Sequence, residues 1–312
     1  MKHIGFWDHG LKLTGTTTAL YDYAHFNETI LGNRSYVFYE NGNHRNHRSI
    51  IDRFNNRFLT YGVDHFDETD DLIARHGITH LYIIKSGQDL ERQSRVAKNC
   101  IHCVFQCGNP HGDVYAAVSP YIADYNGTVP VVPHIVHLPE SNDSMRAELG
   151  IPDNAVVFGG YGGRHAFDID YVKETVHEVA AKHDHIHFLF ANFEPFGQPR
   201  RNVHFLPAVV SNQKAPFINT CDAMLWARQM GETFGLAIAE FSLLNKPVFA
   251  CKIGYQAHVK LLGDNAIWYT RETLFDQLVR FDPQAAREKD WNNYRSYSPQ
   301  RVMKKFDRVF LS

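Results

Sequence analysis

Short apolar runs alternate with amphipathic stretches along the whole chain. In the first half, runs of strand length occur at residues 3–7, 35–39, 80–84, 101–105, 114–118 and 131–135. Helical spacing of apolar residues falls between them, for example at 16–29 and at 68–76, where Gly77 supplies a helix stop. Strands that alternate with helices in this way predict an α/β protein with parallel sheets.

The pattern stops and then restarts near the middle of the chain. Three prolines and the polar stretch 140–143 precede a new apolar run at 155–159. Strands are then expected at 155–159, 186–191, 203–206, 223–226 and 247–250, with helices at 168–182, 212–219 and 234–244. We therefore expect two domains, 1–140 and 150–290, with a boundary near 137–152.

The last stretch of the chain has apolar residues at helical spacing between 301 and 311. This pattern predicts a final docked helix, about 295–312. We expect this helix to pack back on the first domain. Parallel α/β sheets bind ligands at the carboxyl ends of their strands. Two such domains are expected to face each other across a cleft that holds the site.

Composition narrows the class of protein. The 312 residues are 44% hydrophobic and 21% charged, with a net charge of −2, so no basic field indicates nucleic acid as a partner. No apolar run is long enough to span a bilayer, and the first residues have the pattern of a strand, not of a signal peptide. Five cysteines, an odd count, are typical of reduced thiols, so we expect a cytoplasmic protein.

The segment 221–250 carries the main functional signal. A predicted strand ends in a loop with Gly231 and Gly235, and a helix begins near Phe234, so its first amides point to the strand ends. A helix start in this position binds phosphate without a metal ion. Seven residues separate Glu232 from Glu240. A carboxylate accepts two hydroxyl hydrogen bonds at once, which suits the diols of a sugar and of a ribose.

This segment resembles the E-x7-E motif of retaining glycosyltransferase family 4. The flanks agree with that family: Thr233-Phe234-Gly235 follows the first glutamate, and Lys246-Pro247-Val248 follows the second. The similarity covers most of residues 1–280 and is strongest at 155–250. The alternative is a plain strand–helix–strand unit with two solvated glutamates.

A second glycine-rich segment, 158–164, ends in Gly163 and Arg164. It resembles the loop of the same family whose arginine binds the donor diphosphate, and arginine supplies a forked donor for phosphate oxygens. The alternative is a glycine-rich turn with a surface arginine.

The resemblance implies a GT-B fold, two Rossmann-like domains, and a hexosyltransferase that moves a sugar from a nucleotide diphosphate, most often UDP or GDP, to a hydroxyl of a carbohydrate or glycoconjugate. It implies retention of configuration, with no cofactor and no metal. The catalytic residues would be Glu232 and His111. The donor would contact Gly163, Arg164, Arg228, Thr233, Phe234, Gly235 and Glu240, and a first-domain loop with Gly15, Thr16 and Thr17 would face the reacting sugar.

Two of these assignments have simple structural alternatives. The loop at 14–17 is also the pattern of a helix start capped by Thr14. His111 is one of 19 histidines, most of which belong to the surface or the core.

The chain departs from the family at one phosphate-binding position. The family places a lysine five or six residues after the arginine, where this chain has Ile169 and Asp170. Arg228 is the first substitute that the sequence offers, ahead of Lys173 and Lys252.

Two patterns resemble metal sites. Asp168 and Asp170 form an Asp-x-Asp pair, which we interpret as a helix cap or first-turn acids. Cys100, Cys103 and Cys107 lack a further ligand pair at zinc-finger spacing, so we expect reduced core thiols.

Two other functions fit the same fold. The first is a GT-B epimerase or hydrolase, which would act without an acceptor. The second is a non-catalytic nucleotide-sugar-binding domain, which would bind without turnover. The sequence specifies neither the sugar, the base and the acceptor nor the oligomeric state.

Overall fold

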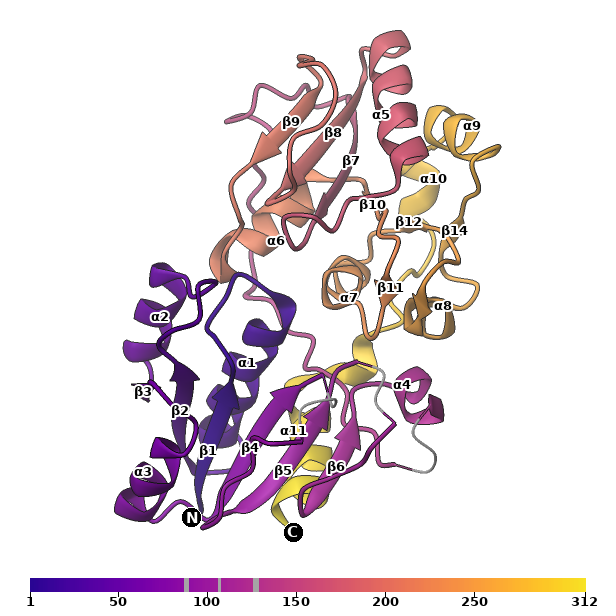
Figure 1. The fold of residues 1–312 in the computed structure, drawn as a ribbon. Coiled ribbons are helices and arrows are strands. Elements are labelled where there is room, and N and C mark those ends of the chain that lie inside the picture. Colours follow the sequence, from indigo (N-terminus) through magenta and orange to yellow (C-terminus); the bar gives the residue numbers. More distant parts are fainter. Residues whose placement is uncertain (87–89, 106–107, 126–128) are drawn as a thin grey trace. The chain divides into compact units, whose positions relative to one another are not determined.

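The computed structural model describes residues 1–86, 90–105, 108–125 and 129–312. The chain forms two compact units, each with its own parallel sheet (Figure 1). The first unit consists of Met1–Ile135 and Tyr297–Ser312, and the second of Val136–Ser296. The stretch 137–152, expected as the boundary, belongs to the second unit. In the described part of the chain, no helix is long and apolar enough to cross a membrane.

The first unit is built on a six-stranded parallel sheet of order β3-β2-β1-β4-β5-β6. Its strands are β1 (His3–Asp8), β2 (Arg34–Glu40), β3 (Leu59–Val63), β4 (His80–Lys85), β5 (Lys98–Cys103) and β6 (Val114–Ala117). The helices α1 (Gly15–Thr29), α2 (Arg48–Asn55) and α3 (Glu68–His76) connect the first four strands in turn, and α4 (Pro120–Tyr125) follows β6. The central strand β1 pairs with β2 on one side and β4 on the other, and its side chains after His3 are buried.

One predicted strand of the first unit does not form. The run at 131–135 makes a single bridge, between Val131 and Ala117. Pro130 and Pro133 flank this bridge, and neither has the backbone N–H that a longer ladder needs. Conversely, the structure contains α2 and β3, which the apolar pattern did not predict. Helix α2 lies in a polar stretch rich in Asn and Arg, and β3 follows that stretch.

The end of the chain completes the core of the first unit. It comprises the turn Arg295–Tyr297, α11 (Pro299–Phe306) and a final turn of π-helix, Asp307–Leu311. The Phe306 ring lies 5.2 Å from that of Tyr23, and the Phe310 ring lies 5.4 Å from that of Tyr82. The Cys100 thiol donates to the Phe310 carbonyl at 3.2 Å. The last helix therefore packs within the first unit.

The second unit has a six-stranded parallel sheet of order β14-β12-β10-β7-β8-β9. Its strands are β7 (Val156–Tyr161), β8 (Ile186–Ala191), β9 (Val203–Leu206), β10 (Ala223–Leu225), β12 (Val248–Ala250) and β14 (Ile267–Trp268). A small separate pair joins β11 (Gly231–Glu232) to β13 (Tyr255–Gln256). The helices are α5 (Asp170–Lys182), α6 (Ser211–Thr220), α7 (Leu236–Leu243), α8 (Ala257–Leu262), α9 (Leu274–Val279) and α10 (Pro283–Arg287).

A buried ion pair fixes the start of this second sheet. The Arg146 guanidinium donates to the Asp222 carboxylate at 2.8 Å and to the carbonyls of Ala155 and Thr220 at 2.9 and 3.2 Å. Arg287 donates to the other Asp222 oxygen at 3.2 Å. The segment before β7 is thereby attached to the residues between α6 and β10.

Candidate functional site

Most of the predicted donor residues of the second unit lie in loops that follow the carboxyl ends of its central strands. Strands β7 and β10 are parallel neighbours, paired at Ala223 and Phe158. The loop with Gly163 and Arg164 follows the carboxyl end of β7, and the loop with Arg228 and Glu232 follows that of β10. Open α/β sheets bind their ligands at the carboxyl ends of their strands.

Glu232 is held by two donors. The indole N–H of Trp226 donates to one carboxylate oxygen at 3.0 Å, and the Arg228 guanidinium lies 3.3 Å from the other. The Trp226 ring in turn packs on the buried His258 ring, with 4.5 Å between centroids. The Glu232 side chain is 18% exposed, so its carboxylate has a fixed direction and remains accessible.

The loop that carries Glu232 is pinned from two sides. Gly231 has φ of 72°, and a Cβ on it would lie 2.3 Å from the Tyr255 carbonyl oxygen, so only glycine fits there. The Met230 carbonyl accepts from the Tyr255 amide at 2.7 Å. On the other side, the Asp168 carboxylate accepts from the Gln229 amide at 2.7 Å.

The interpretation of Asp168 as a helix cap is wrong. Helix α5 begins at Asp170, with Ile169 at its N-cap position, so only Asp170 is a first-turn acid. Asp168 lies before the helix and uses its carboxylate to hold the loop after β10. In the part of the chain that the structure describes, no group of three or more His, Cys, Asp or Glu side chains is placed to bind a metal ion.

Helix α7 starts at Leu236, slightly later than expected. Gly235 is its N-cap residue, in the left-handed region with φ of 83°. The first amides of any helix lack an acceptor within the helix, so they are donors for an anion. Phe234 is a core residue whose ring packs on Tyr294, so it offers a ligand its backbone and not its side chain. Thr233 is half-buried beside them.

Glu240 is deeply buried, with 3% of its side chain exposed. One carboxylate oxygen lies 2.5 Å from the Lys214 ammonium nitrogen, and the other accepts a short hydrogen bond from the Tyr161 hydroxyl. The alternative of two solvated glutamates is therefore wrong for this chain. Neither partner was predicted from the sequence, although Lys214 lies on the predicted helix at 212–219 and the family lysine is absent.

Arg164 is an exposed cation in the loop after the carboxyl end of β7. Its side chain is 67% exposed, and its guanidinium lies 3.6 Å from the Glu194 carboxylate. The loop itself is ordered, because the Asn192 amide donates to the Gly162 carbonyl at 2.7 Å. At Gly163 a Cβ would meet nothing closer than Ala166, at 4.0 Å, so the backbone there is open to a ligand.

In the first unit, the loop after β1 has a structural role for most of its residues. Thr14 is the N-cap of α1 and accepts from the Thr17 amide at 3.5 Å, which confirms the capping prediction. The buried Thr17 hydroxyl donates to Asp8 at 3.0 Å, and the pKa of this carboxyl is raised by its burial. Gly15 is exposed and Thr16 half-buried.

His111 lies at the opposite end of the first sheet. Just after it, the Asp113 amide donates to the carbonyl of Asn99, the second residue of β5. The neighbouring Lys98 is in register with His80, which is itself in register with Ile4 near the start of β1. A catalytic His111 would have to lie beside the loop after β1 with Gly15 and Thr16, and the structure does not bring it there, because the chain has crossed to the amino ends of the strands by that point.

The cysteines are core residues where the structure describes them. Cys100, Cys103, Cys221 and Cys251 are buried thiols, and burial raises the pKa of Cys100 to about 12. Cys107 lies outside the described residues.

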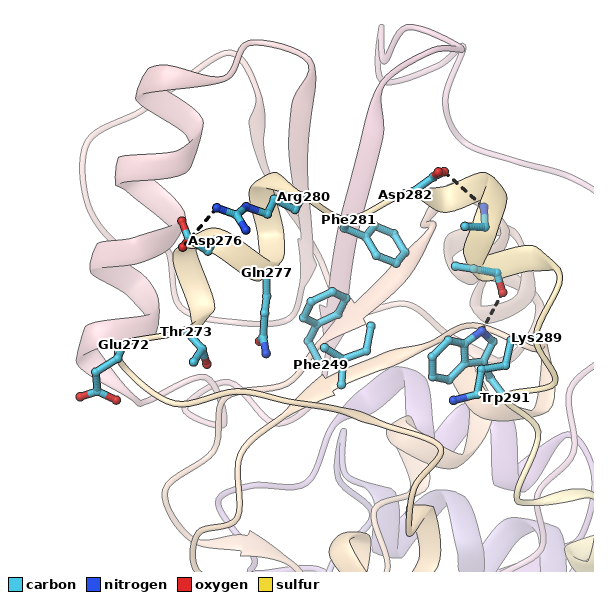
Figure 2. Close-up of a pocket in the computed structure, with 13 residues that line it drawn as sticks. Phe249, Glu272, Thr273, Asp276, Gln277, Arg280, Phe281, Asp282, Lys289 and Trp291 are labelled. Carbon is cyan, nitrogen blue, oxygen red and sulfur yellow. Dashed lines mark hydrogen bonds and ion pairs between the residues drawn. The ribbon is translucent and has the colours of Figure 1, made fainter.

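A cavity of about 630 Å³ opens elsewhere in the second unit, between β12, β14, α9 and α10 (Figure 2). The aromatic rings of Phe249, Phe281 and Trp291 line it, and charged side chains surround the rings. Two of these charged side chains interact with other residues of the lining. The Arg280 guanidinium lies 3.9 Å from the Asp276 carboxylate, and the Lys289 ammonium lies 4.1 Å from the Trp291 ring centroid. None of the predicted donor residues lines this cavity.

Comparison with solved structures identifies the architecture. The chain matches HepE of Anabaena, solved with UDP and glucose, with a TM-score of 0.70 and 13% identity over 100% of both chains. The fold is that of the GT-B glycosyltransferases. A glycosyltransferase of Rickettsia africae matches with a TM-score of 0.68 and 12% identity, over 99% of this chain and 97% of that one. TarM of S. aureus, solved with fondaparinux, alpha-GlcNAc-glycerol and UDP, matches with a TM-score of 0.70 and 12% identity over 100% of both chains. No family model and no curated protein matches the sequence.

Proposed function

We propose that this chain is a glycosyltransferase that moves a hexosyl group from a nucleotide-diphosphate sugar to a hydroxyl of a carbohydrate acceptor, without a metal ion. One observation carries the proposal. The loops after β7 and β10 bring an exposed arginine, a positioned glutamate and the start of a helix to the carboxyl ends of the strands of one sheet. Structural neighbours solved with UDP support the same assignment.

The proposed site has to stabilise the negative charge of the leaving group. Departure of a nucleotide diphosphate adds negative charge to its phosphates, and preorganised donors stabilise that charge in the transition state. Arg164 and the first amides of α7 are such donors, and the open backbone at Gly163 lets a phosphate approach. In this proposal Thr233 and Gly235 contact the donor through the backbone at the start of α7. Arg228 contributes a further cation beside Glu232.

The two glutamates take separate parts of the donor in this proposal. Glu232, aimed by Trp226, accepts hydrogen bonds from the hydroxyls of the transferred sugar. Glu240 accepts from the ribose, in the company of Lys214 and Tyr161. In the first unit, the Thr17 hydroxyl donates to Asp8, so we do not propose it as a ligand of the sugar. We propose retention of configuration on the resemblance to glycosyltransferase family 4 alone.

Thermal shift in EDTA tests donor binding. The intact chain is heated with UDP-, GDP-, ADP- and dTDP-sugars, beside the variants Arg164→Ala and Glu240→Ala. A ligand that binds only the folded state raises the melting temperature by mass action, so one donor should stabilise the wild type and neither variant.

Arg201→Ala is the matched control, because Arg201 is an exposed arginine that is ion-paired to Asp184 outside the proposed site. It should keep the full shift. The absence of any shift in the wild type, with EDTA and also with divalent cations, would overturn the proposed function.

A further inference from the structure

Three elements of the second unit converge on Glu240. Lys214 comes from the first turn of α6, Tyr161 is the last residue of β7, and Glu240 lies in α7. The Lys214 side chain is 13% exposed, and its ammonium lies 2.5 Å from Glu240 and 5.7 Å from the Tyr161 ring centroid. Phe217 and Phe241 pack on the Tyr161 ring at 5.5 and 5.8 Å. A largely buried charged pair thus lies beside a cluster of aromatic rings.

Stability alone gives little reason for such a pair. Desolvation of two charges offsets most of their attraction, and well-packed apolar residues of similar size are often as stabilising. The pair lies beside the end of β7, at the edge where the donor is proposed to bind. Its position therefore points to a role in binding.

Hydrogen-bond chemistry identifies what the pair is suited to bind. A carboxylate only accepts and an ammonium only donates, whereas a hydroxyl does both. Lysine has three N–H bonds, and the contact with Glu240 needs one of them. A hydroxyl placed beside both groups would donate to Glu240 and accept from Lys214. The nucleotide part of the proposed donor carries such hydroxyls on its ribose.

We infer that Lys214 is a specificity-determining residue of the donor site, which donates to a ribose hydroxyl while Glu240 accepts from the ribose. Tyr161 is a positioning residue, since its hydroxyl holds the second Glu240 oxygen and fixes the plane of the carboxylate. This inference rests on the proposed function. It assigns to α6 a polar contact that the resemblance in sequence did not imply.

Titration calorimetry on the intact chain tests the inference. The nucleoside diphosphate that stabilises the wild type is compared with its 2′-deoxy and 3′-deoxy analogues. One of the two analogues lacks the hydroxyl that bonds to Lys214 and Glu240. The wild type should bind that analogue at least about tenfold more weakly, because hydrogen bonds to charged groups are lost. Lys214→Met removes one of the two hydrogen bonds to that hydroxyl, so the ratio of the affinities for the ribose and deoxyribose forms should fall several-fold, while Glu240 keeps part of the preference.

Lys182→Met is the matched control, because Lys182 makes an exposed ion pair with Glu178 at 2.7 Å and should keep the wild-type ratio. Circular dichroism checks the fold of each variant. If Lys214→Met does not fold, Lys214→Arg replaces it, since the charge is kept while the donor atoms move, and the ratio should again fall. A ratio in either folded variant equal to that of the wild type would overturn the inference.

The wild type alone gives two further outcomes. Equal binding of the ribose and deoxyribose forms would overturn the role of Lys214 and leave the proposed function standing. No binding of any nucleotide would overturn both.

Discussion

At the scale of single residues, the sequence identified positions better than it identified contacts. The pattern predicted Glu232 in the loop after a strand and Glu240 in the helix that follows, and the structure places Glu232 after β10 and Glu240 in α7. It does not reveal that Trp226 aims the first glutamate or that Lys214 covers the second. Trp226 lies six residues before Glu232, but the path of the loop decides that the two meet, and Lys214 comes from a separate helix 26 residues before Glu240.

Gly231 gives a residue-scale prediction. Gly231→Ala places a Cβ 2.3 Å from the Tyr255 carbonyl at a φ of 72°, so both sterics and backbone conformation oppose it. We expect a loss of at least about 1–3 kcal/mol in the free energy of unfolding, measured by urea denaturation. Gly42→Ala is the control, because nothing lies within 4 Å of its Cβ position. Equal stability of the two variants would contradict the account of this loop.

At the scale of elements, periodicity located most strands and helices of both sheets. It failed where the pattern is polar, at α2 and β3, and where prolines limit pairing, at 131–135. It also did not show how the loop with His111 returns to the amino ends of the strands. Apolar spacing reports which face of an element is buried, but not which end of a sheet a loop reaches.

Arg146 gives the prediction at this scale. Arg146→Met leaves the buried Asp222 carboxylate with Arg287 alone, and also removes the donors to the Ala155 and Thr220 carbonyls. Removing one partner of a buried pair costs about 3–5 kcal/mol, so urea denaturation should show a loss of that order. For comparison, Arg48→Met breaks an exposed pair with Asp52 and should cost under about 1 kcal/mol. Similar losses in both variants would mean that the Arg146 pair does not fasten the second sheet.

At the scale of the whole molecule, composition and alternation predicted the two-sheet architecture, and the structural comparisons confirm the GT-B fold. Low identity to every reported neighbour means that the fold is shared while the pockets are not specified. The sugar and the acceptor depend on side chains that differ between such proteins. They follow from ligands and not from the fold.

Acid sensitivity is a property of the whole first unit. Burial lowers the pKa of His102 to about 3 and that of His134 well below its ordinary value of 6.5. Below pH 6.5 these two histidines become protonated in the unfolded chain but stay neutral in the folded unit. Their contribution to stability is therefore complete above pH 6.5 and is lost as the pH drops toward 3. Urea denaturation followed between pH 8 and 4 should show this decline. His102→Phe should flatten it, whereas an unchanged slope would contradict the assignment.

The central claim is tested most directly by a transfer assay in EDTA. The intact chain is incubated with each nucleotide sugar and a pool of carbohydrate acceptors, and mass spectrometry follows both the nucleotide and the acceptors. We predict release of a nucleoside diphosphate with a matching gain of one hexose on an acceptor, and loss of both in Glu232→Gln. Consumption of the donor with no gain of hexose on any acceptor would contradict the claim and favour a hydrolase or an epimerase. Binding of the donor with no consumption would contradict it and favour a binding domain.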